Sequence, residues 1–150
     1  MNGGIEGTMR LEILCEMDLG YTTEFFLVQP YGGEEGSAYG EGDGTVEGDS
    51  LNGNARWSNH PHRRSDGSML PNTRGVIETS DGALVIFDLE GRTIWSEDGS
   101  AGGQNLVVTF EAEEERYRWL NNVLCVGEGV IDPEKLRAKI RIYTCVNELL

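Results

Sequence analysis

The sequence predicts an all-β protein: a single antiparallel β-barrel of eight or more strands with one short helical turn. Its 21 glycines are spread along the chain between short apolar runs, which is typical of many short strands joined by turns. Several of those runs alternate apolar and polar residues, the period of a strand with one buried face. With 150 residues, the chain suits one domain with its own core, so residues 1–150 are expected to form one unit.

The first two strands are predicted from alternation and from a proline. The segment RLEILCEM (residues 10–17) has an apolar face and an acidic face, which are Leu11, Ile13, Cys15 and Met17 against Glu12 and Glu16. The segment EFFLVQP (residues 24–30) is expected to be a second strand that Pro30 ends.

Residues 31–50 contain seven glycines, six acidic residues and no lysine or arginine. We expect most of this stretch to be a flexible loop. Because long loops are often functional, a lid over the barrel mouth is the functional alternative.

The middle of the chain holds the clearest hairpin signal. A strand is expected in residues 45–57, which continues or turns at Asn52-Gly53. In residues 73–95, two apolar or β-branched runs flank Asp81-Gly82, a dipeptide that readily adopts the positive φ of a tight hairpin. A second turn is expected at Glu90-Gly91.

The C-terminal part adds three strands and the helical turn. Residues 104–112, 123–131 and 135–146 are expected to be strands, and EEERYRWLNN (residues 113–122) is the segment with helical character. The last strand has an apolar face and a basic face, which are Ala138, Ile140, Ile142, Thr144 and Val146 against Arg137, Lys139 and Arg141.

Charge and composition exclude several classes of partner. A net charge of −14 argues against nucleic acid and anionic membranes, because both would be repelled. No apolar run reaches the length of a membrane span, and the opening segment MNGGIEGTMRLEILCEM has no signal-peptide pattern. Three cysteines without CxxC spacing indicate neither disulfides nor a thiolate zinc site, so we expect a cytoplasmic protein.

Four short motifs together resemble one family. They are GTVEGDSLNG at Gly44–Gly53, TSDGA at Thr79–Ala83, YRWLN at Tyr117–Asn121 and VGEG at Val126–Gly129. In their order and spacing they resemble domain-of-unknown-function family 3237, over about Thr45 to the C-terminus. The resemblance implies a small barrel similar to calycin-like or allene-oxide-cyclase-like barrels, without an assigned reaction. Residues 57–72 depart from the shorter stretch of many members, so a general family role need not transfer.

The segment WSNHPHRRSDG (residues 57–67) is the main candidate for chemistry. Residues 56–74 hold four arginines and one aspartate, a local charge of +3, whereas the rest holds eight basic and 25 acidic residues. His60 or His62 would act as a general acid or base. Arg63 and Arg64 would hold an anion, because guanidinium groups suit carboxylates and phosphates. In the same segment, the aromatic ring of Trp57 and the side-chain amide of Asn59 are candidate ligand contacts.

The alternative for this segment is an ordinary surface loop whose arginines pair with nearby acids. Such ion pairs contribute about 0–1 kcal/mol each. A metal site is not predicted, because proline separates the two histidines and no third nitrogen or sulfur ligand is available.

Strand alternation gives a second set of candidates. Glu128 shares a face with Leu124 and Val126, and Arg74 shares a face with Glu78. If those faces line the barrel, these side chains would hold a ligand or act as acid and base. If the opposite faces point inward, all three are solvated; glycine-rich strands bulge easily, which makes the phase hard to read.

Two aromatic side chains of the helical turn, Tyr117 and Trp119, would either close one end of the barrel or stack against a ligand.

These observations predict binding of a small, largely apolar organic molecule with an anionic or carbonyl group inside the barrel. Cofactor-free acid/base chemistry of the lyase or isomerase type would fit the histidine and arginine pairs, with no cofactor or metal. The alternative is a non-catalytic carrier or sensor of a hydrophobic small molecule. A scaffold that acts through the barrel surface is disfavoured, because the pattern shows no exposed apolar strip. A barrel of this size is compatible with a homodimer, although the sequence does not show one.

Overall fold

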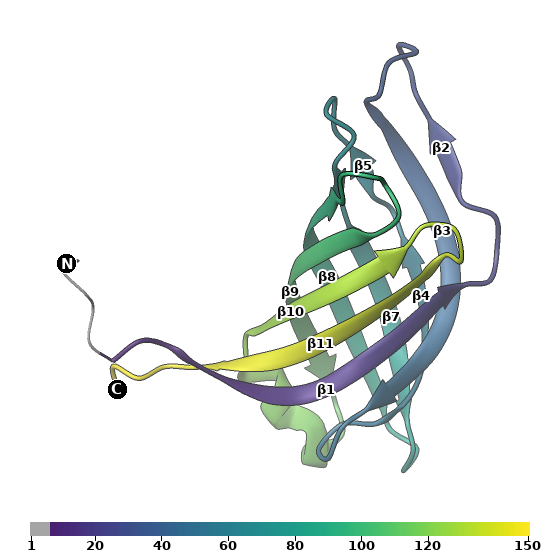
Figure 1. The fold of residues 1–150 in the computed structure, drawn as a ribbon. Coiled ribbons are helices and arrows are strands. Elements are labelled where there is room, and N and C mark those ends of the chain that lie inside the picture. The colour runs from purple at the N-terminus through teal and green to yellow at the C-terminus, as the bar shows by residue number, and fades with distance from the viewer. Residues whose placement is uncertain (1–6) are drawn as a thin grey trace.

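The computed structural model describes residues 7–150; residues 1–6, the first part of the segment without a signal-peptide pattern, lie outside the described residues. The described residues form eleven strands and one short 3-10 helix (Figure 1). The elements are β1 Arg10–Tyr21, β2 Phe26–Val28, β3 Gly36–Glu47, β4 Gly53–Asn59, β5 His62–Arg63, β6 Met69–Leu70, β7 Asn72–Thr79, β8 Leu84–Trp95, β9 Gly102–Ala112, η1 Glu115–Asn122, β10 Cys125–Asp132 and β11 Arg137–Val146.

Eight of the strands close into an antiparallel barrel, which confirms the predicted fold class. Going round the wall, the order is β1, β3, β4, β7, β8, β9, β10 and β11, and β11 pairs with β1 to close it. The short strands β2, β5 and β6 add to β3 and β8 at one end. Closure leaves the barrel wall itself without a free edge.

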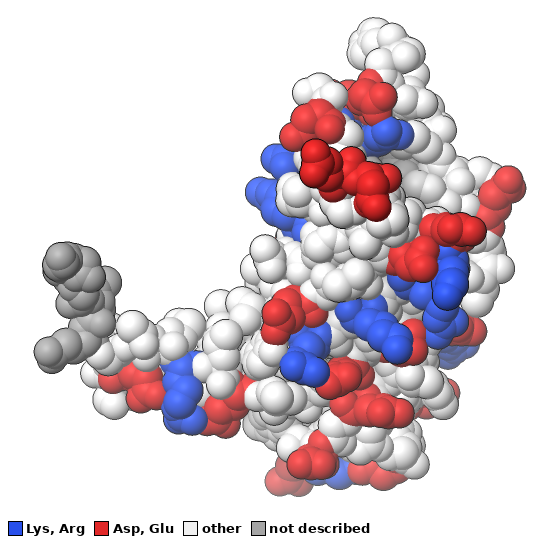
Figure 2. All heavy atoms as spheres, in the orientation of Figure 1, with Lys and Arg blue, Asp and Glu red and all other residues white. Residues whose placement is uncertain are grey.

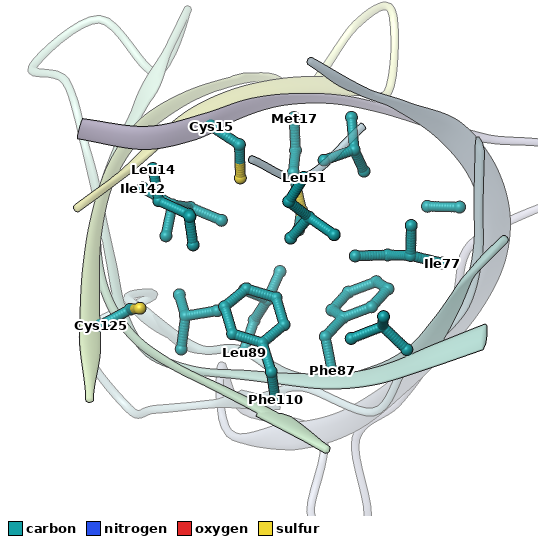
Figure 3. Close-up of a cluster of buried hydrophobic side chains, with 14 of the residues drawn as sticks. Leu14, Cys15, Met17, Leu51, Ile77, Phe87, Leu89, Phe110, Cys125 and Ile142 are labelled. Carbon is teal, nitrogen blue, oxygen red and sulfur yellow. The ribbon is translucent and has the colours of Figure 1, made fainter. Parts of the chain in front are cut away.

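The core is the barrel interior. Figure 3 shows side chains pointing inward from all sides of the wall, among them Met17, Ile77, Phe87 and Phe110. The short helix η1 lies at the opposite end from β2 and β5 (Figure 1), where its Leu120 is buried in the core cluster. No helix within residues 7–150 is long and apolar enough to cross a membrane.

The predicted hairpin at Asp81-Gly82 is confirmed. The Thr79 N–H donates to the Ala83 carbonyl over 2.8 Å, and Gly82 has the φ of +92° that favours glycine. The predicted turn at Glu90-Gly91 is wrong, because β8 runs on to Trp95. Gly91 is needed for close packing instead: a Cβ there would lie 2.0 Å from the Asn105 carbonyl oxygen.

The loop predicted for residues 31–50 is also wrong over most of its length, since β3 occupies Gly36–Glu47. Its glycines lie where the wall meets other groups closely. A Cβ on Gly42 would lie 2.0 Å from the Gly20 carbonyl oxygen and 2.4 Å from the Trp57 ring. Glycine therefore marks close approach in this strand, and not flexibility.

The predicted face of β1 changes partway along the strand. Cys15 and Met17 are buried as expected, but Leu11 and Ile13 are 49% and 66% exposed. The cause is a β-bulge, since the pairing with β11 shifts between Ile13 and Cys15. The extra residue, Leu14, is buried beside Cys15, so the residues before it point outward.

Candidate ligand-binding cavity

A cavity of about 270 Å³ opens at the end of the barrel opposite η1, and a smaller one of about 40 Å³ continues into the core. The two share five lining residues, which are Tyr21, Asn59, Pro71, Gln104 and Ile131. These residues come from β1, β4, β9 and β10 and from the segment before β7. The site is therefore built by strands from all round the barrel.

The cavity walls are mainly apolar. The larger cavity is lined by Phe25, Leu27, Met69, Trp95, Ile131 and Leu136, together with three prolines. Tyr21 packs edge-on against Phe25 and Trp57, with ring centroids 5.6 and 4.8 Å apart. Gly40 makes room for this cluster, because a Cβ there would lie 2.3 Å from the Tyr21 ring.

Tyr21 offers a hydrogen-bond donor to the cavity. The Asn59 side-chain amide donates to the Tyr21 hydroxyl oxygen over 3.0 Å, and Asn59 Oδ1 accepts the Asn72 backbone N–H over 3.0 Å. Within residues 7–150 the Tyr21 hydroxyl hydrogen has no acceptor. Burial raises the pKa of this hydroxyl, against the opposing effect of the bond from Asn59. Tyr21 is thus a protonated, oriented donor.

Gln104 offers the complementary group. Its Nε2 donates to Thr93 Oγ1 over 3.1 Å, whereas its Oε1 is the one buried side-chain oxygen or nitrogen in residues 7–150 without a hydrogen-bond partner. Such an atom costs about 1–3 kcal/mol when it stays unpaired, so it calls for a reason. Because Gln104 lines both cavities, a hydrogen-bond donor on a molecule bound there would give its Oε1 a partner.

Residues 57–67 contribute one charged side chain to the larger cavity. Arg63 lines the larger cavity and forms an ion pair with Glu34. Arg64 points to its own turn, where Nε donates to Ser68 Oγ over 2.9 Å. Asp66 closes that turn by accepting the Ser68 N–H over 2.9 Å, and the bonds from Ser68 lower the pKa of Asp66.

Neither histidine lines either cavity. The His60 ring packs edge-on against the exposed Tyr39, with centroids 5.0 Å apart, and its Nε2 lies 3.1 Å from Ser58 Oγ. His62 pairs with Ser37 and Leu70 in the added strands. The structure thus brings Trp57, Asn59 and Arg63 to the cavity and leaves both imidazoles and Arg64 outside it.

The face placements of Glu128, Arg74 and Glu78 follow the solvated alternative. Glu128 lies on the outer face of β10, where it accepts the Tyr143 hydroxyl. Arg74 is exposed and pairs with Asp88 at 3.0 Å, and Glu78 is exposed on the same outer face. The interior is lined instead by Cys125 and Gly127 in β10 and by Ile77 in β7.

The two aromatic candidates of the helical turn lie at the other end of the barrel. Tyr117 is buried and donates to Asp81 Oδ1 over 2.8 Å, which makes it part of the barrel closure. Trp119 is 41% exposed. Neither residue contacts the cavities described above.

Sequence reasoning missed Tyr21 and Gln104, although a signal for both was present. Tyr21 continues the inward alternation of Met17 and Leu19. Gln104 continues the inward alternation of Leu106 and Val108, so it is a polar residue on an apolar face. A polar residue in such a position is informative, because burying it requires a partner.

Comparison with known proteins identifies the fold and not the activity. The family model described as "Protein of unknown function (DUF3237)" matches residues 11–145, a longer stretch than the motifs indicated. A search of curated proteins returned no match.

Several solved structures share the barrel, three of which follow. A β-barrel-like protein from Acinetobacter baumannii AYE has a TM-score of 0.82 and 22% identity, over 92% of this chain and 96% of that one. A protein of unknown function from Clostridium acetobutylicum ATCC 824 has a TM-score of 0.80 and 17% identity, over 92% and 99%. An enzyme from Penicillium herquei has a TM-score of 0.69 and 20% identity, over 94% and 99%.

Proposed function

This chain belongs to the DUF3237 family of proteins of unknown function, and we propose that it binds a small, largely apolar organic molecule inside its barrel. The ligand carries a carbonyl group that accepts from Tyr21 and a hydroxyl or N–H group that donates to Gln104. The observation that carries this proposal is the unpaired Gln104 Oε1 in a cavity with mainly apolar walls.

Size and polarity support a ligand of this class. The larger cavity, at about 270 Å³, is slightly smaller than the lower limit of the roughly 300–1,000 Å³ range of small-molecule sites. Apolar walls supply affinity by burial, and a few polar groups set orientation. The Gln104 amide turns about a torsion with a broad preference, so a ligand donor in the cavity can recruit its Oε1.

The residues lining the cavities favour a carrier or sensor over an enzyme. No aspartate, glutamate, histidine, lysine or cysteine lines either cavity within the described chain, which leaves Tyr21 and Arg63 as the ionisable groups there. General acid/base catalysis needs a group that reaches the reacting proton. From their positions, His60, His62 and Glu128 do not supply one.

An enzyme remains the second candidate, because the Penicillium herquei neighbour is named as one. In that case the Tyr21 hydroxyl would stabilise negative charge that develops on the ligand carbonyl oxygen, as in a lyase or isomerase. Arg63 would take the electrostatic role expected of the arginine pair.

Binding is tested by calorimetry with two probes, acetophenone and 4-hydroxyacetophenone, which differ in one hydrogen-bond donor. We expect 4-hydroxyacetophenone to bind more tightly. Tyr21→Phe should weaken both probes about tenfold, the effect of one hydrogen bond of roughly 1.4 kcal/mol. Gln104→Met should remove the difference between the probes. Tyr39→Phe, at an exposed tyrosine outside the cavities, is the matched control and should change neither affinity.

The proposal fails if neither probe binds at millimolar concentration, or if Tyr39→Phe has the same effect as Tyr21→Phe. Catalysis is tested on the same complexes in D₂O by NMR. A carrier leaves the rate of exchange of the methyl protons beside the carbonyl at the buffer value, whereas an enzyme of the second kind accelerates it and Tyr21→Phe abolishes the acceleration.

A further inference from the structure

Strands β1 and β11 continue beyond the barrel as a two-stranded arm, with the C-terminus at its tip (Figure 1). In the arm, Arg10–Ile13 pair with Tyr143–Val146 on one side. On the other side, β3 pairs with β1 only from Glu16 onward. Gly48 approaches the Leu14 carbonyl, where a Cβ on Gly48 would lie 2.4 Å from that oxygen. Within residues 7–150, therefore, no strand pairs with the second edge of β1 up to Ile13, and that edge is free.

The side chains on one face of the arm are apolar and continue onto the barrel. Cross-strand pairing aligns Ile13 with Tyr143, Val126 and Val107 in one row across four strands. A second row joins Leu11 to Cys145 and Leu124. Leu11, Ile13, Val107 and Leu124 are each at least 47% exposed, which is unusual for a contiguous set.

The opposite face of the arm is charged. Arg10 and Glu12 project there and pair with each other, and Arg10 also pairs with Glu148. Figure 2 shows the same division: charged atoms lie along the lower side of the arm, and its upper side is largely uncharged. In a chain of net charge −14, an uncharged surface is where a second copy can approach most closely.

We propose that this free edge pairs with the same edge of a second copy, antiparallel and across a two-fold axis at Leu11. The pairing extends the arm into a four-stranded sheet through Met9–Ile13 of each copy. A free strand edge is a template for such pairing, and two-fold contacts join the same surface of both copies. This proposal is independent of ligand binding in the barrel.

The charges on the arm select this register. With Leu11 opposite the partner's Leu11, each Arg10 faces a Glu12, and each Ile13 faces a Met9. Opposite charges directly across an antiparallel pair stabilise it, and like charges destabilise it. Shifting the axis by one residue to Glu12 would oppose two glutamates. An axis between Leu11 and Glu12 would put apolar residues opposite charged ones, so the Leu11 register is the one that satisfies both faces.

Association is measured by sedimentation velocity from 1 to 200 µM. We expect the wild type to dimerise within this range. Leu11→Asp, which opposes two carboxylates on the axis, should weaken the dimer at least tenfold. Glu12→Arg should also weaken it, because each new arginine faces Arg10. The double variant Arg10→Glu/Glu12→Arg restores opposite charges and should recover affinity to within about threefold of the wild type.

Val130→Asp is the matched control, since Val130 is a 57% exposed valine on the same outer face of β10 but near the other end of the strand. It should leave the dimer unchanged. Circular dichroism of each variant verifies the fold. A wild type that stays monomeric at 200 µM overturns the proposal, as does a dimer that Leu11→Asp and Val130→Asp affect equally.

Cysteine cross-linking tests the register in a Cys145→Ser background, which removes the thiol opposite position 11. Leu11→Cys should form a disulfide between copies under mild oxidation. Ile13→Cys should not cross-link with itself, but an equimolar mixture of Ile13→Cys and Met9→Cys should. Self-linking of Ile13→Cys together with no linking of Leu11→Cys would show a different contact and overturn the assignment.

Discussion

The Tyr117 hydroxyl donates a hydrogen bond to Asp81 Oδ1 over 2.8 Å, which ties η1 to the tip of the β7–β8 hairpin. The same carboxylate accepts from Arg116 Nε over 2.8 Å and from Thr79 Oγ1 over 2.6 Å. Donors from three residues therefore meet at one exposed carboxylate, and together they hold η1 over the end of the barrel.

The first prediction concerns acid stability. Hydrogen bonds from Arg116, Thr79 and Tyr117 lower the pKa of Asp81 well below its usual value. A carboxylate whose pKa is lower in the folded state stabilises the fold at pH values above its unfolded-state pKa of about 3.9. This contribution is lost as the pH falls toward the folded-state pKa. Asp81→Asn should therefore reduce the free energy of unfolding at pH 7, and its difference from wild type should shrink below pH 4.

Urea unfolding at several pH values measures that difference. Asp49→Asn is the control, because Asp49 accepts no side-chain hydrogen bond in the described structure, and it should follow the wild type throughout. A difference for Asp81→Asn that stays constant down to pH 2 would contradict the assignment.

A second prediction concerns the glycines of the wall. Gly42→Ala would put a methyl group 2.0 Å from the Gly20 carbonyl oxygen, so it should lower the free energy of unfolding by about 1–3 kcal/mol. Gly103→Ala is the matched control in another barrel strand, where the nearest atom lies 3.9 Å from the added Cβ. Thermal and urea unfolding compare the two, and equal effects would refute a steric origin.

A third prediction concerns the thiols, all three of which are free. Burial raises the pKa of Cys15 to about 12 and that of Cys125 to about 11. Since the thiolate is the reactive form, both should resist Ellman's reagent at pH 8 while the protein is folded. Cys145 is partly exposed and should react first, and Cys145→Ser should remove the fast phase.

A fourth prediction separates stability from ligand binding. Gln104→Met removes a buried oxygen without a partner, and it also removes the hydrogen bond to Thr93. Because these two losses oppose each other, the free energy of unfolding should stay equal or rise by up to about 1 kcal/mol. Asn59→Leu removes an amide with both of its polar atoms paired and should be destabilising by about 1–3 kcal/mol. Urea unfolding without ligand makes the comparison, and a large loss for Gln104→Met would show that its amide serves the fold.

The fold was predictable because its signals are local. Asp81-Gly82 specifies a hairpin through backbone conformation alone, and Ile140 and Ile142 alternate with arginine and lysine within one strand. The errors arose where distant contacts decide. The glycines of β3 are read as flexible in isolation, whereas Tyr21 and Trp57 lie against them in the barrel.

The candidate site was less predictable. Local charge indicated a site in residues 57–67, whereas two polar groups of the cavity lie at the ends of β1 and β9. Two charged residues of that segment, Arg64 and Asp66, are accounted for by a local turn, in which the Ser68 side chain bonds to both. Tyr21 and Gln104 lie far apart in the sequence, and only barrel closure brings both to one cavity.

The bulge at Leu14 divides β1 into a part that packs in the barrel interior and a part that is exposed. From Cys15 to Leu19, a substitution changes the packing of the interior, and the barrel as a whole is affected. From Arg10 to Ile13, a substitution alters only what the molecule presents to its surroundings. In the dimer proposed above, these four positions therefore govern assembly, while the barrel and its cavity depend on other residues.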